Sequence, residues 1–332
     1  MIKDSKNYLH TLLTLSKNQK KVYNLILDSM RNGGVRVLLP PFVGVRSAAY
    51  YIKLVIAEHP ELSSFDACVY SYSQTNAGNY ITIPSVITGE QRNRLEKSGD
   101  IIIKRLIKPG YSDIKKALII HDFLVNTTSY DHGALTDESK ARYAHTAYGA
   151  VVMHKAVCEG IAYAYSFLLK KAGIRSTVVD GLAGGEGHAW NIIEVGGEFY
   201  HVDATWNINY RESTGDHEKI YDYFCLCDDD LGSRVWDRVI YPKCDSRRFN
   251  YFQVTGTLAH NDAELTAILE RQIDKYDSVY LKQDFLNLGK DELHRYIYEK
   301  IAKIAQQKRW GEVSFTTTVT EDVGVIKVKF SH

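Results

Sequence analysis

Three residues near the centre of the chain have the side-chain types that a carbonyl-attacking enzyme needs. Cys158 precedes an apolar helical pattern, His188 opens the segment HAWN, and Asp203 lies in the segment DATW. In such a set the thiol is the nucleophile, the imidazole moves the proton and the carboxylate orients the imidazole. If the three side chains meet in space, the sequence predicts an enzyme that acts on amide-type carbonyls.

The segment after Cys158 predicts a helix that begins at the cysteine. Apolar side chains recur at helical spacing from Ile161 to Ala172, and Lys170 and Lys171 fall in the last turn. Cys158 then lies at the N-terminal end, where unpaired N–H groups and the helix dipole favour a thiolate. A lone cysteine at a helix start is more often an inert core residue, so the interpretation depends on the other two residues.

His188 and Asp203 belong to the two arms of a predicted β-hairpin. The pair Gly196-Gly197 between HAWNIIEV and EFYHVDATW is typical of a two-residue turn. This turn sets Trp190 opposite Asp203, so Asp203 becomes the diagonal neighbour of His188 on the same face. A shift of one residue would send the two side chains to opposite faces. We therefore expect Asp203 to hold one ring nitrogen of His188 while the other faces the thiol.

Several other polar residues have simpler interpretations. His121, His145 and His154 are expected in helices with apolar neighbours, where a structural role is the commoner one. His201 shares the face of the pair but lies one step further along the hairpin, which makes it a substitute partner at most. The run GLAGGEG (181–187) lacks the ending of a phosphate loop, and we expect a mobile segment beside the site. No group of His, Cys and Asp has metal-ligand spacing, so neither a metal nor another cofactor is expected.

Two longer runs around the three residues resemble a known family. The run AYGAVVMHKAVCEGIAYAYSFLLKKAGI and the later run GHAWNIIEVGGEFYHVDATWN are similar to the core of the bacterial transglutaminase-like superfamily. Matched motif by motif, the resemblance gives Cys158, His188 and Asp203 the catalytic roles, with Trp190 and Trp206 as flanking aromatic residues.

The resemblance covers about residues 109–250 and implies an α+β, papain-like core in which the cysteine helix packs against an antiparallel sheet. Many relatives carry a histidine shortly before a downstream tryptophan, where this chain has the segment SRVW (233–236). The second donor to an oxyanion is left open. Tyr148 and Trp190 are the candidates for it, and Trp206 is a candidate for lining the substrate.

The implied chemistry leaves three functions open. A peptidase or amidase would form a thioester with a peptide or glutamine-type amide, and water would release it. A protein-crosslinking transglutaminase would use a lysine amine instead of water. A non-catalytic module would keep the fold and bind peptide or glycan. The complete Cys, His and Asp set favours an enzyme with a protein or peptide substrate, and hydrolysis is preferred because no amine-acceptor feature is readable.

The chain is expected to fold as three parts. An N-terminal α/β module covers 1–108, the catalytic core covers 109–255 and a C-terminal α/β module covers 256–332. A capping box of Thr88 and Gln91 begins the helix that leads to the first boundary. Both end modules read α-β-α-β-β, by duplication or by coincidence. Their expected elements are helices at 17–32, 46–58, 262–275 and 290–308, and strands at 35–40, 66–72, 79–84, 278–283, 313–319 and 324–330.

The composition is that of an ordinary globular protein, with 45% hydrophobic and 24% charged residues in 332. The net charge of +1 gives no reason to expect nucleic acid or an anionic membrane as a partner. No apolar run reaches the roughly 20 residues of a membrane span. The N-terminus lacks the apolar region of a signal peptide, so we expect a cytoplasmic protein, or an extracellular one if a leader had been removed. The five cysteines are too scattered for a disulfide scaffold, and Cys225 and Cys227 are expected to be structural.

Overall fold

A computed structural model of the chain describes residues 15–34, 36–65, 70–76, 78–136, 141–215, 220–239, 241–273, 278–310 and 314–331. The chain divides into two compact units. Unit 1 is Met1–Ile220 with Arg234–Cys244, and unit 2 is Tyr221–Ser233 with Asp245–His332. The boundaries expected at residues 108 and 255 stay a prediction.

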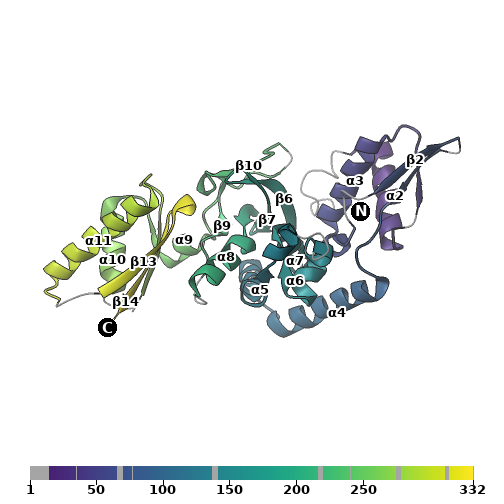
Figure 1. Ribbon diagram of the computed structural model, residues 1–332. Coiled ribbons are helices and arrows are strands. Elements are labelled where there is room, and N and C mark those ends of the chain that lie inside the picture. Colours follow the sequence, from purple (N-terminus) through teal and green to yellow (C-terminus); the bar gives the residue numbers. More distant parts are fainter. Residues whose placement is uncertain are drawn as a thin grey trace. The chain divides into compact units, whose positions relative to one another are not determined.

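Among the described residues, unit 1 opens with a small α/β module in which α-helices accompany an antiparallel sheet of strands β1, β2 and β3 (Figure 1). The sheet has the strand order β1-β3-β2. Its elements are α2 (Lys17–Arg31), β1 (Val37–Leu39), α3 (Val45–Glu58), the 3-10 helix η1 (Pro60–Leu62), β2 (Ser71–Thr75) and β3 (Gly78–Thr82). The first part of the strand expected at 66–72, including Cys68, lies outside the described residues.

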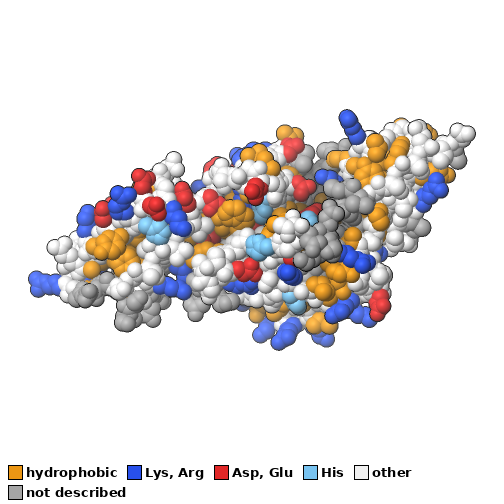
Figure 2. Space-filling model, viewed as in Figure 1, with side chains coloured by type: hydrophobic (Ala, Val, Ile, Leu, Met, Phe, Trp, Pro, Cys, Tyr) orange, Lys and Arg blue, Asp and Glu red, His pale blue; other side chains and the backbone are white. Residues whose placement is uncertain are grey.

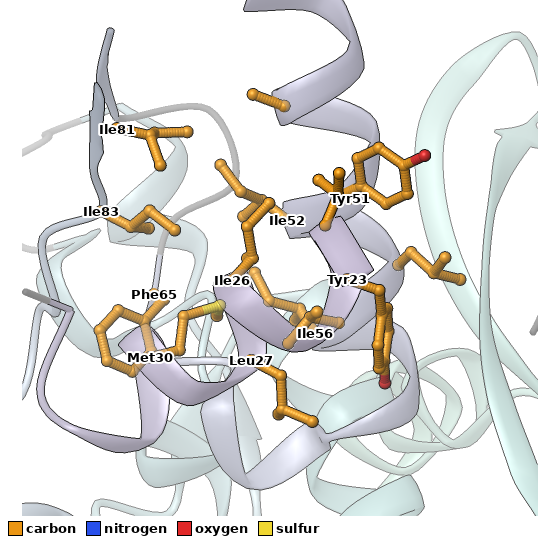
Figure 3. Close-up of a cluster of buried hydrophobic side chains, with 14 of the residues drawn as sticks. Tyr23, Ile26, Leu27, Met30, Tyr51, Ile52, Ile56, Phe65, Ile81 and Ile83 are labelled. Atoms are coloured by element: carbon orange, nitrogen blue, oxygen red, sulfur yellow. The ribbon is translucent and has the colours of Figure 1, made fainter. Parts of the chain in front are cut away.

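An apolar cluster holds this module together. Ile26 of α2 and Ile52 of α3 are fully buried, and they meet Ile81 of β3 in one cluster (Figure 3). Burying an aliphatic side chain of this size stabilises a fold by about 1.5–3 kcal/mol. The apolar side chains that recur at helical spacing on α2 and α3 therefore face the same core as the buried side chains of β3.

The rest of unit 1 is a helical layer against an antiparallel sheet. Helix α7 packs against β6 and β7, and the strands lie side by side in the order β10-β6-β7-β8. The elements in chain order are α4 (Gly89–Leu106), α5 (Asp113–Thr127), β4 (Ser129–Tyr130), η2 (His132–Leu135), η3 (Ala141–Tyr143), α6 (Ala147–Val152), β5 (Lys155–Ala156), α7 (Cys158–Lys171), β6 (Ser176–Ala183), β7 (Glu186–Val195), β8 (Glu198–Val202), α8 (Ala204–Thr214) and β10 (Arg234–Trp236). The capping box expected at Thr88 and Gln91 is present at the start of α4.

Unit 2 is a second α/β module with a four-stranded sheet, and α10 and α11 pack against that sheet (Figure 1). The sheet has the strand order β11-β12-β14-β13. The elements of unit 2 in chain order are β9 (Phe224–Leu226), η4 (Asp228–Asp230), α9 (Tyr251–Thr255), β11 (Leu258–Ala259), α10 (Asp262–Ile273), β12 (Ser278–Gln283), α11 (Lys290–Gln307), β13 (Ser314–Thr320), η5 (Glu321–Val323) and β14 (Val325–Ser331).

The two end modules share one topology. In the first, β1 pairs antiparallel with β3, and β3 pairs with β2. In the second, β12 pairs antiparallel with β14, and β14 pairs with β13. The order helix, strand, helix, strand, strand along the chain thus gives the same strand order twice, and the second module adds β11 parallel to β12.

Three expectations about local structure are wrong. The run 181–187 is not a loose segment, because Ala183 pairs with Glu186 across a two-residue turn. Gly184 and Gly185 both have positive φ, as such a turn requires. His145 lies in a turn and His154 in a bend, so neither is helical.

No helix among the described residues is long and apolar enough to cross a membrane. On the face shown in Figure 2, acidic and basic side chains are intermixed, as the net charge of +1 suggests. The described cysteines are free thiols, and Cys225 and Cys227 are buried.

Candidate active site

Cys158 is the first residue of α7, as the sequence predicts, and it is partly exposed. It packs beside a small cluster of Ala162, Val178 and Ala189, which ties the start of the helix to the sheet. Gly160 is what lets this helix start come close to the preceding loop. A Cβ at that position would lie 2.2 Å from the carbonyl oxygen of Ala144, so only glycine fits there.

The hairpin that carries the other two residues has the predicted register. Val195 pairs with Glu198 and Ile192 pairs with His201. The second strand, however, ends at Val202 rather than running through DATW. Asp203 is the N-cap of α8 and accepts the backbone N–H of Trp206 at 3.1 Å.

The early end of β8 has a physical reason. Aspartate is among the best N-cap residues, and here capping outweighs the continuation of the strand. Thr205 is therefore helical, and the residue opposite His188 is Gly181 of β6. Asp203 still contacts His188 as expected, because it directly follows Val202, which pairs with Asn191 in the predicted register.

His188 and Asp203 form a buried pair. His188 Nε2 lies 2.7 Å from Asp203 Oδ2, and the two side chains are only 8% and 3% exposed. Burial alone would lower the pKa of His188. The charge and hydrogen bond of Asp203, together with a hydrogen bond to Cys158, instead raise it to about 9. The thiol is thus near enough to His188 to affect its pKa, and the imidazolium form is favoured at neutral pH.

Arg234 is a further charged residue beside this pair that the sequence argument did not predict. It comes from β10, its side chain is fully buried, and it forms an ion pair with Asp203 Oδ2. Burial alone would raise the pKa of Asp203, but Arg234 first and His188 second hold it well below its usual range. Its segment, SRVW, departs from the many relatives that carry a histidine there, but that departure did not indicate a contact with Asp203.

Tyr130 is a second residue that the sequence argument missed. Strand β4 pairs in parallel with β5 and sets Tyr130 beside Ala156, two residues before the cysteine. Its hydroxyl group lies close enough to the side chain and the backbone of Cys158 to interact with both. Burial and the nearby charge of Cys158 raise the pKa of Tyr130 to about 12, so the hydroxyl keeps its proton.

The other candidates surround the pair. The Trp190 ring stacks on His188 with centroids 5.9 Å apart, and the Trp206 ring meets it edge-on at 6.1 Å. The indole N–H of Trp190 donates to His201 Nδ1 at 3.0 Å, so that donor is already used. This bond also ties His201 to the tryptophan. Tyr148 is buried, with its ring 5.4 Å from that of Tyr143.

Two of the remaining histidines have partners of their own. His121 is fully buried on α5, and its Nε2 lies 2.8 Å from the Asn207 amide of α8. His145 lies 2.9 Å from Glu159 and is half-exposed. The first contact connects two helices that flank α7, which suits the structural role expected of His121.

Comparison with known proteins identifies the core. Residues 102–204 match the family model described as the Transglutaminase-like superfamily. This segment of the chain is similar to a transglutaminase-like core. Its α+β architecture, with a cysteine-bearing helix packed on an antiparallel sheet and an α/β module on either side in sequence, confirms the fold that the resemblance implied.

The curated relatives share only part of their length with this chain. Kyphoscoliosis peptidase of Mus musculus is 25% identical over 131 residues, which is 36% of this chain and 20% of that protein. The Homo sapiens protein of the same name is 26% identical over 123 residues, 33% of this chain and 18% of its own. The chain thus spans about a fifth of these relatives. A crystal structure of a TGase covers 51% of this chain and 50% of its own, at 14% identity and a TM-score of 0.31, a likeness that says nothing about function.

Proposed function

We propose that this transglutaminase-like protein is a cysteine-dependent enzyme that transfers the acyl group of a peptide or glutamine-type amide. The observation that carries the proposal is the position of His188, which interacts with Asp203 on one side and with Cys158 on the other. A histidine between a thiol and a carboxylate can take up and deliver the proton that acyl transfer requires.

The steps follow from these contacts. Because Nε2 of His188 bonds to Asp203, the other ring nitrogen, Nδ1, is the one that takes the proton of the thiol. The sulfur of Cys158 attacks the carbonyl carbon of the amide, and a tetrahedral oxyanion forms. His188 returns the proton to the leaving amine, the C–N bond breaks, and a thioester remains. Water or a second amine then attacks the thioester and regenerates the thiol.

The oxyanion needs donors, and two lie beside the sulfur. The backbone N–H of Cys158 belongs to the first turn of α7, where it has no partner within the helix. The hydroxyl of Tyr130 lies close to the same residue. We assign these two groups to the oxyanion in place of Tyr148 and Trp190, because the indole N–H of Trp190 is held by His201.

Hydrolysis is the preferred outcome, and amine transfer is the second candidate. The curated relatives are named peptidases, which supports hydrolysis, and transfer stays open because the thioester can be attacked by water or by an amine. A non-catalytic peptide- or glycan-binding role is the third. A binding role would not explain why His188 is held by Asp203 next to the thiol.

Trapping the thioester tests the proposal. The protein and its Cys158→Ala variant are incubated with a panel of peptides containing glutamine and other amides, and intact mass is measured. We expect a covalent adduct on the wild type and none on the variant. Adding a primary amine then separates the two enzymes, since transfer yields an amide-linked product and hydrolysis yields the acid. A panel that gives neither adduct nor product with the wild type would favour the binding module.

A further inference from the structure

Asp203 is bound on both carboxylate oxygens. Oδ2 accepts from His188 Nε2 at 2.7 Å and also from the guanidinium of Arg234. Oδ1 accepts the backbone N–H of Trp206 at 3.1 Å. The negative charge is therefore shared between one cation that can lose its proton and one that, as an arginine, does not lose it in proteins.

The indole rings of Trp190 and Trp206 contact both Arg234 and His188. The Arg234 guanidinium carbon lies 5.2 Å from the centre of the Trp190 ring and 5.1 Å from that of Trp206. These are the two rings that also contact His188, one stacked and one edge-on. Because aromatic faces attract a guanidinium, the two rings keep Arg234 against the carboxylate while His188 moves protons.

The acyl-transfer cycle changes the charge of His188 but not the burial of Asp203. The imidazole is charged while it holds the proton of the thiol, and it is neutral once it has passed that proton to the leaving amine. Asp203 is 3% exposed, and a carboxylate buried without a cation is strongly disfavoured. With only a neutral histidine beside it, Asp203 would take up a proton or lose its position.

We propose that Arg234 is a positioning residue that keeps Asp203 ionised and oriented whenever His188 is neutral. The effect of Arg234 on turnover rests on the proposed function. Its effect on the ionisation of Asp203 is already present in the protein without substrate. Arg234 lies in the segment SRVW (233–236), where this chain departs from the many relatives that carry a histidine shortly before the tryptophan. The other titratable groups that interact with the pair are Cys158 of α7 and Tyr130 of β4, and the test leaves both unchanged.

The first measurement uses the wild-type protein. Histidine labelled with nitrogen-15 and aspartate labelled with carbon-13 are followed by NMR between pH 5 and pH 10, and signals are assigned from the His188→Gln and Asp203→Asn variants. We expect the Asp203 carboxyl signal to stay in its ionised position while His188 titrates. Uptake of a proton by Asp203 as His188 becomes neutral would overturn the proposal.

The second measurement compares variants. In Arg234→Gln the midpoint of the His188 titration should rise by about one pH unit or more, because no second cation competes for the carboxylate. Arg234→Lys should bring the midpoint back toward the wild-type value, since a positive charge is restored, but not fully, because lysine lacks the planar guanidinium that stacks on the two indole rings. Arg238→Gln is the matched control, because Arg238 is exposed and stacks on Trp236, 4.2 Å from its ring centre.

A folded Arg234→Gln protein with the wild-type midpoint would show that Arg234 has only a structural role. If that variant does not fold, the wild-type carboxyl titration and the lysine variant still decide. Neither titration needs a substrate, so this proposal fails or holds independently of the thioester trapping that tests the enzyme activity.

Discussion

At the scale of single residues, the chemistry of the site depends on the charge of Asp203. Asp203→Asn removes the anion that raises the pKa of His188 to about 9, so the titration midpoint should fall to the ordinary value of 6.5 or below it, because burial disfavours the charged imidazole. Thioester formation should drop by about 10²–10⁴-fold, because the imidazole loses both its orientation and its stabilised charged form. NMR titration and intact-mass kinetics measure the two effects. The exposed Asp237→Asn is the control, and a midpoint of His188 that stays near 9 in Asp203→Asn would contradict the assignment.

Tyr130 gives a second prediction at this scale. Tyr130→Phe removes a hydroxyl that lies close to Cys158, while the ring and its packing remain. Thioester formation should fall about 10–100-fold, because one of two donors to the oxyanion is lost. Alkylation of Cys158 by iodoacetamide passes through no oxyanion, so its rate should change much less. Equal losses in both reactions would show that the hydroxyl acts on the sulfur rather than on the oxyanion.

At the scale of elements, sequence patterns predicted what depends on neighbours along the chain. The Gly196-Gly197 turn set the register of the hairpin, and that register held to Val202. The pair Gly184-Gly185 is also typical of a two-residue turn, but the high glycine content of the run 181–187 favoured a mobile segment instead. The capping role of Asp203 also had a local signal, which the apparent continuity of the strand concealed.

Contacts between distant segments left no such signal. Arg234 reaches Asp203 because β10 pairs with β6 at the edge of the sheet, and no periodicity in the segment SRVW reports that pairing. Tyr130 reaches Cys158 through a two-residue parallel pairing, which is too short to predict from a sequence pattern. Both residues act through tertiary structure, so only the folded chain reveals them.

Gly160 yields a prediction about the start of α7. Replacing glycine by alanine inside a helix normally stabilises it by up to about 1 kcal/mol. Here a Cβ would lie 2.2 Å from the carbonyl oxygen of Ala144, so Gly160→Ala should instead destabilise the protein by about 1–3 kcal/mol. It should also slow alkylation of Cys158, because the helix start must shift. The control is Gly187→Ala, where no atom lies within 4 Å of the new Cβ. A gain in stability for Gly160→Ala would show that the loop yields.

Helix α3 carries a pH-dependent contact with α2. The hydroxyl of Tyr23 donates to Glu58 Oε2 at 2.6 Å, and burial raises the pKa of Glu58 from 4.5 to about 7. A carboxyl with a raised pKa in the folded protein stabilises it fully below pH 4.5, and that contribution is lost as the pH rises to about 7.

Glu58→Gln keeps an acceptor oxygen but cannot ionise. Relative to wild type, its free energy of unfolding should therefore rise by about 1–2 kcal/mol between pH 4.5 and pH 7 and stay level above that. Urea unfolding at a series of pH values measures this difference. The exposed Glu90→Gln should show no such trend, and a difference for Glu58→Gln that is independent of pH would contradict the buried, protonated carboxyl.

At the scale of the whole molecule, the residues proposed for chemistry all belong to unit 1, while unit 2 has a core of its own. The two end modules share a strand order, yet their sequences show no clear repeat. What they have in common is the order of helical and strand periodicity, which was readable in advance. Which strands pair was not readable from the sequence, because the register between strands far apart in the chain depends on how the whole core packs.

A core substitution in unit 2 tests how far the site depends on that unit. Ile297 is fully buried on α11, so Ile297→Ala should lower the stability of unit 2 by about 2–5 kcal/mol. Its neighbour Tyr298 is 61% exposed, and Tyr298→Ala serves as the matched control. Calorimetry should show the loss in one transition, while Cys158 in unit 1 is alkylated at the wild-type rate at 25 °C. A slower alkylation in Ile297→Ala but not in Tyr298→Ala would mean that unit 2 helps to form the site, because only the first variant removes a buried side chain of α11.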